Sequence, residues 1–135
     1  MPHSKAVMAS LALALVVIGS ASAAAPLSDA RNRSLLKLEL GTRIEQRCDA
    51  RAGGDVARQH PGFKPDKVIA YAFSDPKRHG TEIVATGAVI RNSGHWYRLS
   101  FRCKTSPDGL EIVSFEHTLG PEIPGWDMSQ LYHGD

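Results

Sequence analysis

Serine, aspartate and histidine stand together in one polar segment, and side chains of these types can form a hydrolytic site. Ser74 and Asp75 precede Pro76, and His79 follows three residues later. A nucleophilic serine needs a neighbouring base and a group that orients the base. The chain lacks the G-x-S-x-G sequence that exposes such a nucleophile, and Asp-Pro commonly opens a turn. These two observations argue against a hydrolytic site. A small hydrolase using Ser74, Asp75 and His79 is therefore only the alternative function, and no residue is assigned as catalytic.

Histidine is a common metal ligand, and five histidines follow residue 23. They are His60, His79, His95, His117 and His133. Zinc sites use three or four converging ligands, often two histidines one helical turn apart, and no two of these histidines have that spacing. His95 and His117 belong to neighbouring predicted strands but stand two positions out of register. The sequence therefore predicts no metal site and no cofactor.

The segment 95–105 alternates apolar and polar side chains, as a strand with one buried face does. Its outward series is Trp96, Arg98, Ser100, Arg102 and Lys104. An aromatic ring with three cations can hold an anionic sugar, a lipid headgroup or an acidic protein surface. The alternative is a solvated face on which Arg98 and Arg102 flank Glu116 diagonally. The candidate binding residues are Trp96, Arg98, Arg102 and Lys104.

Length and composition describe an ordinary single globular domain. The chain has 135 residues, of which 42% are hydrophobic and 22% charged. Its 16 Lys and Arg residues nearly balance 14 Asp and Glu residues. A dedicated nucleic-acid binder of this size carries a much larger positive charge. We therefore expect no nucleic-acid partner.

The first 23 residues have the three parts of a secretory signal peptide. Lys5 gives a positive start, residues 6–18 are apolar, and Ala21-Ser22-Ala23 is a small-residue cleavage site. An apolar stretch this short extends about 20 Å as a helix, against about 30 Å of hydrocarbon in a bilayer. We predict cleavage after Ala23, a single domain at 24–135, no membrane span in the mature chain, and a periplasmic location.

Cys48 and Cys103 are the only cysteines, and both belong to the part predicted to be exported. An even number of cysteines in an oxidising compartment favours pairing. We predict a Cys48–Cys103 disulfide, which would stabilise the fold by roughly 4 kcal/mol through loop closure.

Apolar residues recur at every fourth position of segment 28–51, which predicts one amphipathic helix. The stripe consists of Leu36, Leu40, Ile44 and Cys48. Ser28 or Asp29 can cap its start, and Gly53-Gly54 should end it.

Period-two patterns then predict four antiparallel strands at 67–73, 82–91, 95–105 and 110–118, with a polar loop at 74–81. A three-residue loop around Gly109 would place Cys103 opposite Val113. A similar loop at Asn92-Ser93-Gly94 would place Val89 opposite Tyr97 and Ile83 opposite Cys103. The expected fold is α+β: an N-terminal amphipathic helix on a four-stranded antiparallel meander, with one disulfide.

Several ordered stretches are recognisable together, at 44–49, 67–76, 95–103, 113–115 and 120–124. They resemble the bacterial exported family called domain of unknown function 930, over roughly residues 35 to 132. The resemblance implies a small secreted domain with a paired cysteine, and it names no activity, cofactor or catalytic residue. Where family members often carry a longer charged segment after the cysteine, this chain has Arg51-Ala52-Gly53-Gly54.

Taken together, these features predict an exported periplasmic protein that is not an enzyme. Its expected role is a binding or interaction module of the cell envelope, with an anionic envelope component or a protein as its partner.

Overall fold

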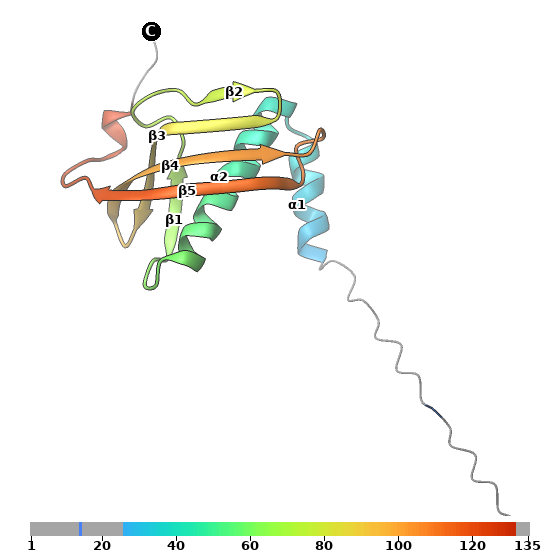
Figure 1. Cartoon of the computed structure of the whole chain (residues 1–135), viewed down its shortest axis with the longest axis horizontal. Coiled ribbons are helices and arrows are strands. Elements are labelled where there is room, and N and C mark those ends of the chain that lie inside the picture. The colour runs from blue at the N-terminus through green and yellow to red at the C-terminus, as the bar shows by residue number, and fades with distance from the viewer. Residues whose placement is uncertain (1–13, 15–25, 132–135) are drawn as a thin grey trace, which may run out of the picture.

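The computed structural model describes residues 26–131 together with residue 14, so the predicted signal peptide lies outside the described residues except for that one position. The elements are α1 (Pro26–Leu36), α2 (Leu40–Gln59), β1 (Pro65–Ile69), β2 (Lys77–His79), β3 (Glu82–Asn92), β4 (His95–Thr105), β5 (Ile112–Glu122) and the short 3₁₀ helix η1 (Met128–Gln130). Figure 1 shows α2 against one face of the sheet and α1 beside its start. The predicted α+β class is confirmed.

Two helices replace the single helix predicted for residues 28–51. Glu39 caps α2, because its carboxylate accepts hydrogen bonds from the backbone N–H groups of Gly41 at 2.9 Å and Thr42 at 3.3 Å. These bonds lower the pKa of Glu39 and hold the carboxylate where the helix dipole favours negative charge. The predicted start of the core helix at Ser28 or Asp29 is therefore wrong, and Leu36 and Leu40 are exposed.

Helix α2 continues through Gly53-Gly54, so the predicted end at these glycines is also wrong. The buried stripe extends beyond Cys48 to Ala52 and Val56. Each glycine costs a helix about 1 kcal/mol relative to alanine, whereas burying a valine side chain stabilises by roughly 1.5–3 kcal/mol. The two glycines together cost about 1–2 kcal/mol, and the burial of Val56 together with Ala52 on the sheet offsets this cost.

The predicted disulfide is confirmed. Cys48 on α2 and Cys103 on β4 are bonded, with 5.9 Å between their Cα atoms. Both are fully buried between helix and sheet. The bond closes a loop of 55 residues and ties the middle of α2 to β4.

The sheet is antiparallel in the order β1-β3-β4-β5, with β2 paired to the first part of β3. The segment predicted as the loop 74–81 thus contains a short strand, Lys77–His79, that was missed. The first strand also differs, since β1 ends at Ile69. After it the chain bends, so that Ala70 and Ala72 are buried and Tyr71 is exposed.

Pairing of β3 with β4 agrees with the predicted register in one half only. A two-residue turn at Ser93 and Gly94, both with positive φ, places Val89 opposite Arg98 rather than Tyr97. A bulge between Ala85 and Ala88 then restores the predicted pairing of Ile83 with Cys103. The register near the turn was wrong because the loop is one residue shorter than predicted.

Pairing of β4 with β5 is shifted by two residues from the prediction, with Cys103 opposite Phe115. Gly109 has the predicted positive φ, but the loop is longer, because the Ser106 N–H donates to the Glu111 carbonyl at 2.8 Å. A two-residue shift leaves Phe115 and His117 facing α2, as predicted. Val113, predicted to face inward opposite Cys103, is exposed, because the pairing is irregular between Lys104 and Thr105. Strand β5 consequently extends to Glu122 and includes Pro121, which an edge strand tolerates.

Two apolar clusters lie on opposite faces of the sheet. The larger one fills the space between α2 and the sheet. The smaller one covers one end of the outer face with Ile69, Ala72, Val89, Trp96 and Trp126. Among the described residues, no helix covers the rest of the outer face (Figure 1). Within the described residues, no helix is both long and apolar enough to cross a membrane.

Candidate binding site

The cationic series predicted on β4 lies on the outer face of the sheet, away from α2. Arg98, Arg102 and Lys104 are exposed, and the residues between them, Leu99, Phe101 and Cys103, are buried in the larger cluster. Period-two alternation thus assigned the correct face to this strand. Three of the four candidate binding residues are accessible to a ligand.

Trp96, the fourth candidate, is not accessible. Only 6% of its surface is exposed, because the ring of Trp126 packs against it and the Arg91 guanidinium lies 5.3 Å from its ring centroid. The expectation of an exposed stacking platform at Trp96 is therefore wrong. The segment after β5 folds back over this end of the sheet. The Pro and Gly residues of this segment did not predict that it packs on Trp96.

Arg98 and Arg102 have different neighbours. The Arg98 guanidinium carbon lies 3.6 Å from the ring centroid of Phe73, a cation–π contact. Arg102 stands directly opposite Glu116, with 3.9 Å between Nε and Oε1. Ion pairs this exposed contribute at most about 1 kcal/mol, so the Arg102 guanidinium can exchange Glu116 for another anion at little cost.

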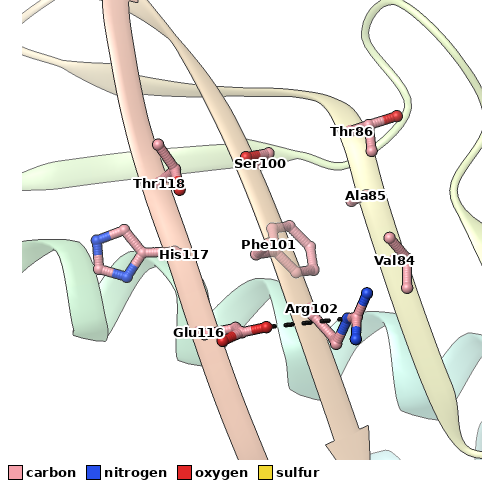
Figure 2. A pocket seen from close by; sticks show the side chains of 9 residues that line it. All are labelled: Val84, Ala85, Thr86, Ser100, Phe101, Arg102, Glu116, His117 and Thr118. Carbon is pink, nitrogen blue, oxygen red and sulfur yellow. Dashed lines mark ion pairs between the residues drawn. The ribbon is translucent and has the colours of Figure 1, made fainter.

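A shallow depression of about 220 Å³ lies beside Arg102 and Glu116. Its floor carries three hydroxyl side chains, Thr86 on β3, Ser100 on β4 and Thr118 on β5, which Figure 2 shows across the three strands. A smaller depression of about 140 Å³ shares these hydroxyls and reaches Arg98. Thr118 was missed as a site residue because the predicted register placed β5 two residues away.

Charge on this open part of the face is predominantly positive. The pairings place Lys77 and Arg102 on the two sides of Val84, and Lys104 opposite Glu82. The cations are Lys77, Arg98, Arg102 and Lys104, and the carboxylates are Glu82 and Glu116. Guanidinium groups beside hydroxyl groups suit an anionic ligand that also offers hydrogen-bonding groups.

The structure does not bring Ser74, Asp75 and His79 into a hydrolytic arrangement. Ser74 is partly buried next to Gly87, whereas Asp75 and His79 are exposed. Across residues 26–131, no hydrogen bond or ion pair connects any two of the three side chains.

His95 and His117 also remain apart. His95 Nδ1 lies 2.7 Å from Oε1 of Glu122 on the open side of the hairpin, while His117 turns toward α2, where its Nδ1 lies 3.1 Å from Asp55 Oδ2. In the part of the chain that the structure describes, no three His, Cys, Asp or Glu side chains converge as a metal cluster would.

These features define a small disulfide-bonded α+β domain with one open, cationic sheet face. A family model described as Domain of Unknown Function (DUF930) matches residues 35–132, and the chain belongs to this family. No curated protein and no solved structure matches the chain.

Proposed function

We propose that this protein is a non-catalytic binding module of the bacterial cell envelope that captures an anionic partner on the outer face of its sheet. The observation that carries the proposal is the row of hydroxyls at Thr86, Ser100 and Thr118 between the guanidinium groups of Arg98 and Arg102. Hydroxyls and guanidinium groups together match the carboxylate or phosphate and the ring hydroxyls of an acidic glycan.

The size of the depression favours an extended partner. Sites that enclose a small molecule usually measure about 300–1,000 Å³, and this depression of about 220 Å³ is smaller and open. It has room for one group of a longer chain. A polymer lying along β4 can contact Arg98 and Arg102 together, since both side chains project from the same face.

Export to the periplasm is part of the proposal. The signal-peptide pattern of residues 1–23 and the buried Cys48–Cys103 disulfide support it, because disulfides persist mainly in oxidising compartments. Mass spectrometry of the protein from a periplasmic fraction should give an N-terminus at residue 24. Recovery of the full chain from the cytoplasm would contradict this part.

Binding can be tested with a carboxylated sugar polymer, oligogalacturonate, measured by isothermal titration calorimetry against neutral dextran of the same length. We expect binding to oligogalacturonate only, weakened at least about tenfold by Arg98→Ala together with Arg102→Ala, and weakened again by added salt. The melting temperature should change little, because both arginines are exposed.

Lys37→Ala together with Lys64→Ala is the matched control, since it removes two exposed cations from other parts of the surface. Equal affinity of wild type and the double arginine variant would refute the glycan surface. If oligogalacturonate does not bind, and a protein binds wild type but not the double arginine variant, then the partner of this surface is a protein and not a glycan.

The alternative, a small periplasmic hydrolase using Ser74, Asp75 and His79, has its own test. Turnover in a screen of ester, amide and glycoside substrates that disappears in Ser74→Ala would favour it. The absence of turnover in wild type would remove it.

A further inference from the structure

Two imidazole rings meet beside the larger apolar cluster, on the face of the sheet opposite the proposed binding surface. His60 is the C-cap residue of α2 and His117 belongs to β5. Their Nε2 atoms lie 3.0 Å apart. His117 has only 2% of its side chain exposed, and His60 is partly exposed at the helix end.

Asp55 fixes the orientation of His117, with its Oδ2 atom 3.1 Å from His117 Nδ1. Arg58 in turn donates to Asp55 Oδ1 at 2.7 Å, and Gln59 to Oδ2 at 3.2 Å. A carboxylate accepts at this contact, which places the His117 proton on Nδ1 and leaves the lone pair on Nε2, facing His60.

We propose that His60 and His117 bind a divalent transition-metal ion, zinc or copper(II), between their Nε2 atoms. Imidazole nitrogens bind these ions at about 2.0–2.1 Å, so two ligands at angles of 90–109° stand about 2.9–3.4 Å apart. The observed separation of 3.0 Å falls in this interval. The ring centroids lie 5.2 Å apart, so with 3.0 Å between the Nε2 atoms the two rings point almost straight at each other. To admit the ion, the partly exposed His60 ring turns aside and gives up any proton on its Nε2, while His117 stays in contact with Asp55.

The surroundings of His117 are those of a metal ligand. Metal-binding histidines commonly donate their other ring N–H to a carboxylate, which fixes the tautomer and makes the ligand nitrogen more basic. Asp55 has this position, and its own oxygens are held by Arg58 and Gln59. Water completes the coordination from the exposed side of His60, since no third such side chain converges here within the described residues.

The test is calorimetric titration of ZnCl₂ and CuCl₂ into the oxidised chain purified without a polyhistidine tag. We expect one bound ion per chain for at least one of the two salts. His60→Gln and His117→Gln should each weaken binding at least about tenfold, and Asp55→Asn about tenfold through the loss of orientation. His79→Gln and His95→Gln, which alter two exposed histidines, are the matched controls and should leave affinity unchanged.

Because His117→Gln can fail to fold, a second measurement uses the wild-type protein. Imidazole ¹⁵N NMR during addition of ZnCl₂ should shift the Nε2 signals of His60 and His117 and leave those of His79 and His95 unchanged. Three results would each overturn the proposal. They are binding that persists undiminished in His60→Gln, zinc-induced shifts at other histidines only, and no binding of either ion to the wild-type chain.

Discussion

The indole ring of Trp96 packs edge-on against the indole ring of Trp126, with 4.9 Å between the ring centroids. This contact attaches the segment after β5 to the outer face of the sheet, where Ile69 and Val89 complete an apolar cluster. It divides that face into a covered end and an open end. The open end carries Arg98 and Arg102, so the proposed binding surface begins where the tryptophan cluster stops.

Trp126→Ala should remove this cover. We expect a loss of about 3 kcal/mol in the free energy of unfolding, because a large buried ring is replaced by a cavity. Trp96 then becomes the only tryptophan of the chain, and its fluorescence emission should move to longer wavelength as water reaches the ring. Urea unfolding and emission spectra provide the measurements. Trp126→Phe, which keeps an aromatic ring, should show smaller changes, and an unshifted Trp96 spectrum in Trp126→Ala would contradict the packing.

The Cys48–Cys103 disulfide should contribute a large part of the stability. Replacing both cysteines by alanine should lower the free energy of unfolding by about 4 kcal/mol, because the unfolded chain regains the freedom lost in a 55-residue loop. The measurement is the urea midpoint of the double variant beside that of wild type with and without a reductant. Wild type under reducing conditions should approach the variant. A midpoint unaffected by reductant would mean that the bond does not constrain the unfolded chain.

The class of fold was predictable because its signals are local. Alternation along β4 identified the buried face, and the positive φ of Gly109 followed from its place in the turn. The four-residue spacing of Ile44 and Cys48 identified the core side of α2. Each of these depends on a few neighbouring residues, and the predicted signal peptide with an even cysteine count was enough to predict the disulfide.

What failed depended on contacts between distant segments. The end of α2 is set by the burial of Val56, not by the preference of Gly53 and Gly54. The bulge near Gly87 lets the chain of Ser74 approach closely, and the tail covers Trp96. The spacing of residues within one segment does not predict such contacts between distant segments. The sequence therefore placed Arg98, Ser100 and Arg102 on the outer face, but the position of Thr118 beside Ser100 needed the correct register of β5.

Two glycine substitutions should have opposite effects on stability. Gly53 lies inside α2, where an added Cβ would be 3.8 Å from Val68, so Gly53→Ala should raise the free energy of unfolding by roughly 0.5–1 kcal/mol. An added Cβ at Gly87 would lie 2.6 Å from the backbone nitrogen of Ser74, so Gly87→Ala should lower it by about 2 kcal/mol. Chemical unfolding of both variants checks the pair. If both substitutions change the free energy of unfolding equally, the segment around Ser74 must move away from the added methyl group at no cost.

Asp49 on α2 is a mostly buried carboxyl group in a groove between the helix and β1. Its Oδ1 atom is buried and makes no hydrogen bond within the described residues. Burial, together with the nearby charge of Glu45, raises the pKa of Asp49 to about 7. The folded protein therefore holds a proton that the unfolded chain, with an ordinary aspartate pKa near 3.9, releases at much lower pH.

Stability should consequently fall as the pH rises from about 4 to 7, because over this range the folded state binds more protons at Asp49 than the unfolded state does. The full penalty, on the order of 4 kcal/mol, is reached above pH 7. Asp49→Asn cannot ionise, so it should match wild type near pH 4 and exceed it by up to this amount at pH 8. Urea unfolding of both proteins at several pH values measures the difference. Glu45→Gln, which removes only the smaller cause, should recover a minor part, and a difference between wild type and Asp49→Asn that stays constant with pH would show that Asp49 titrates normally.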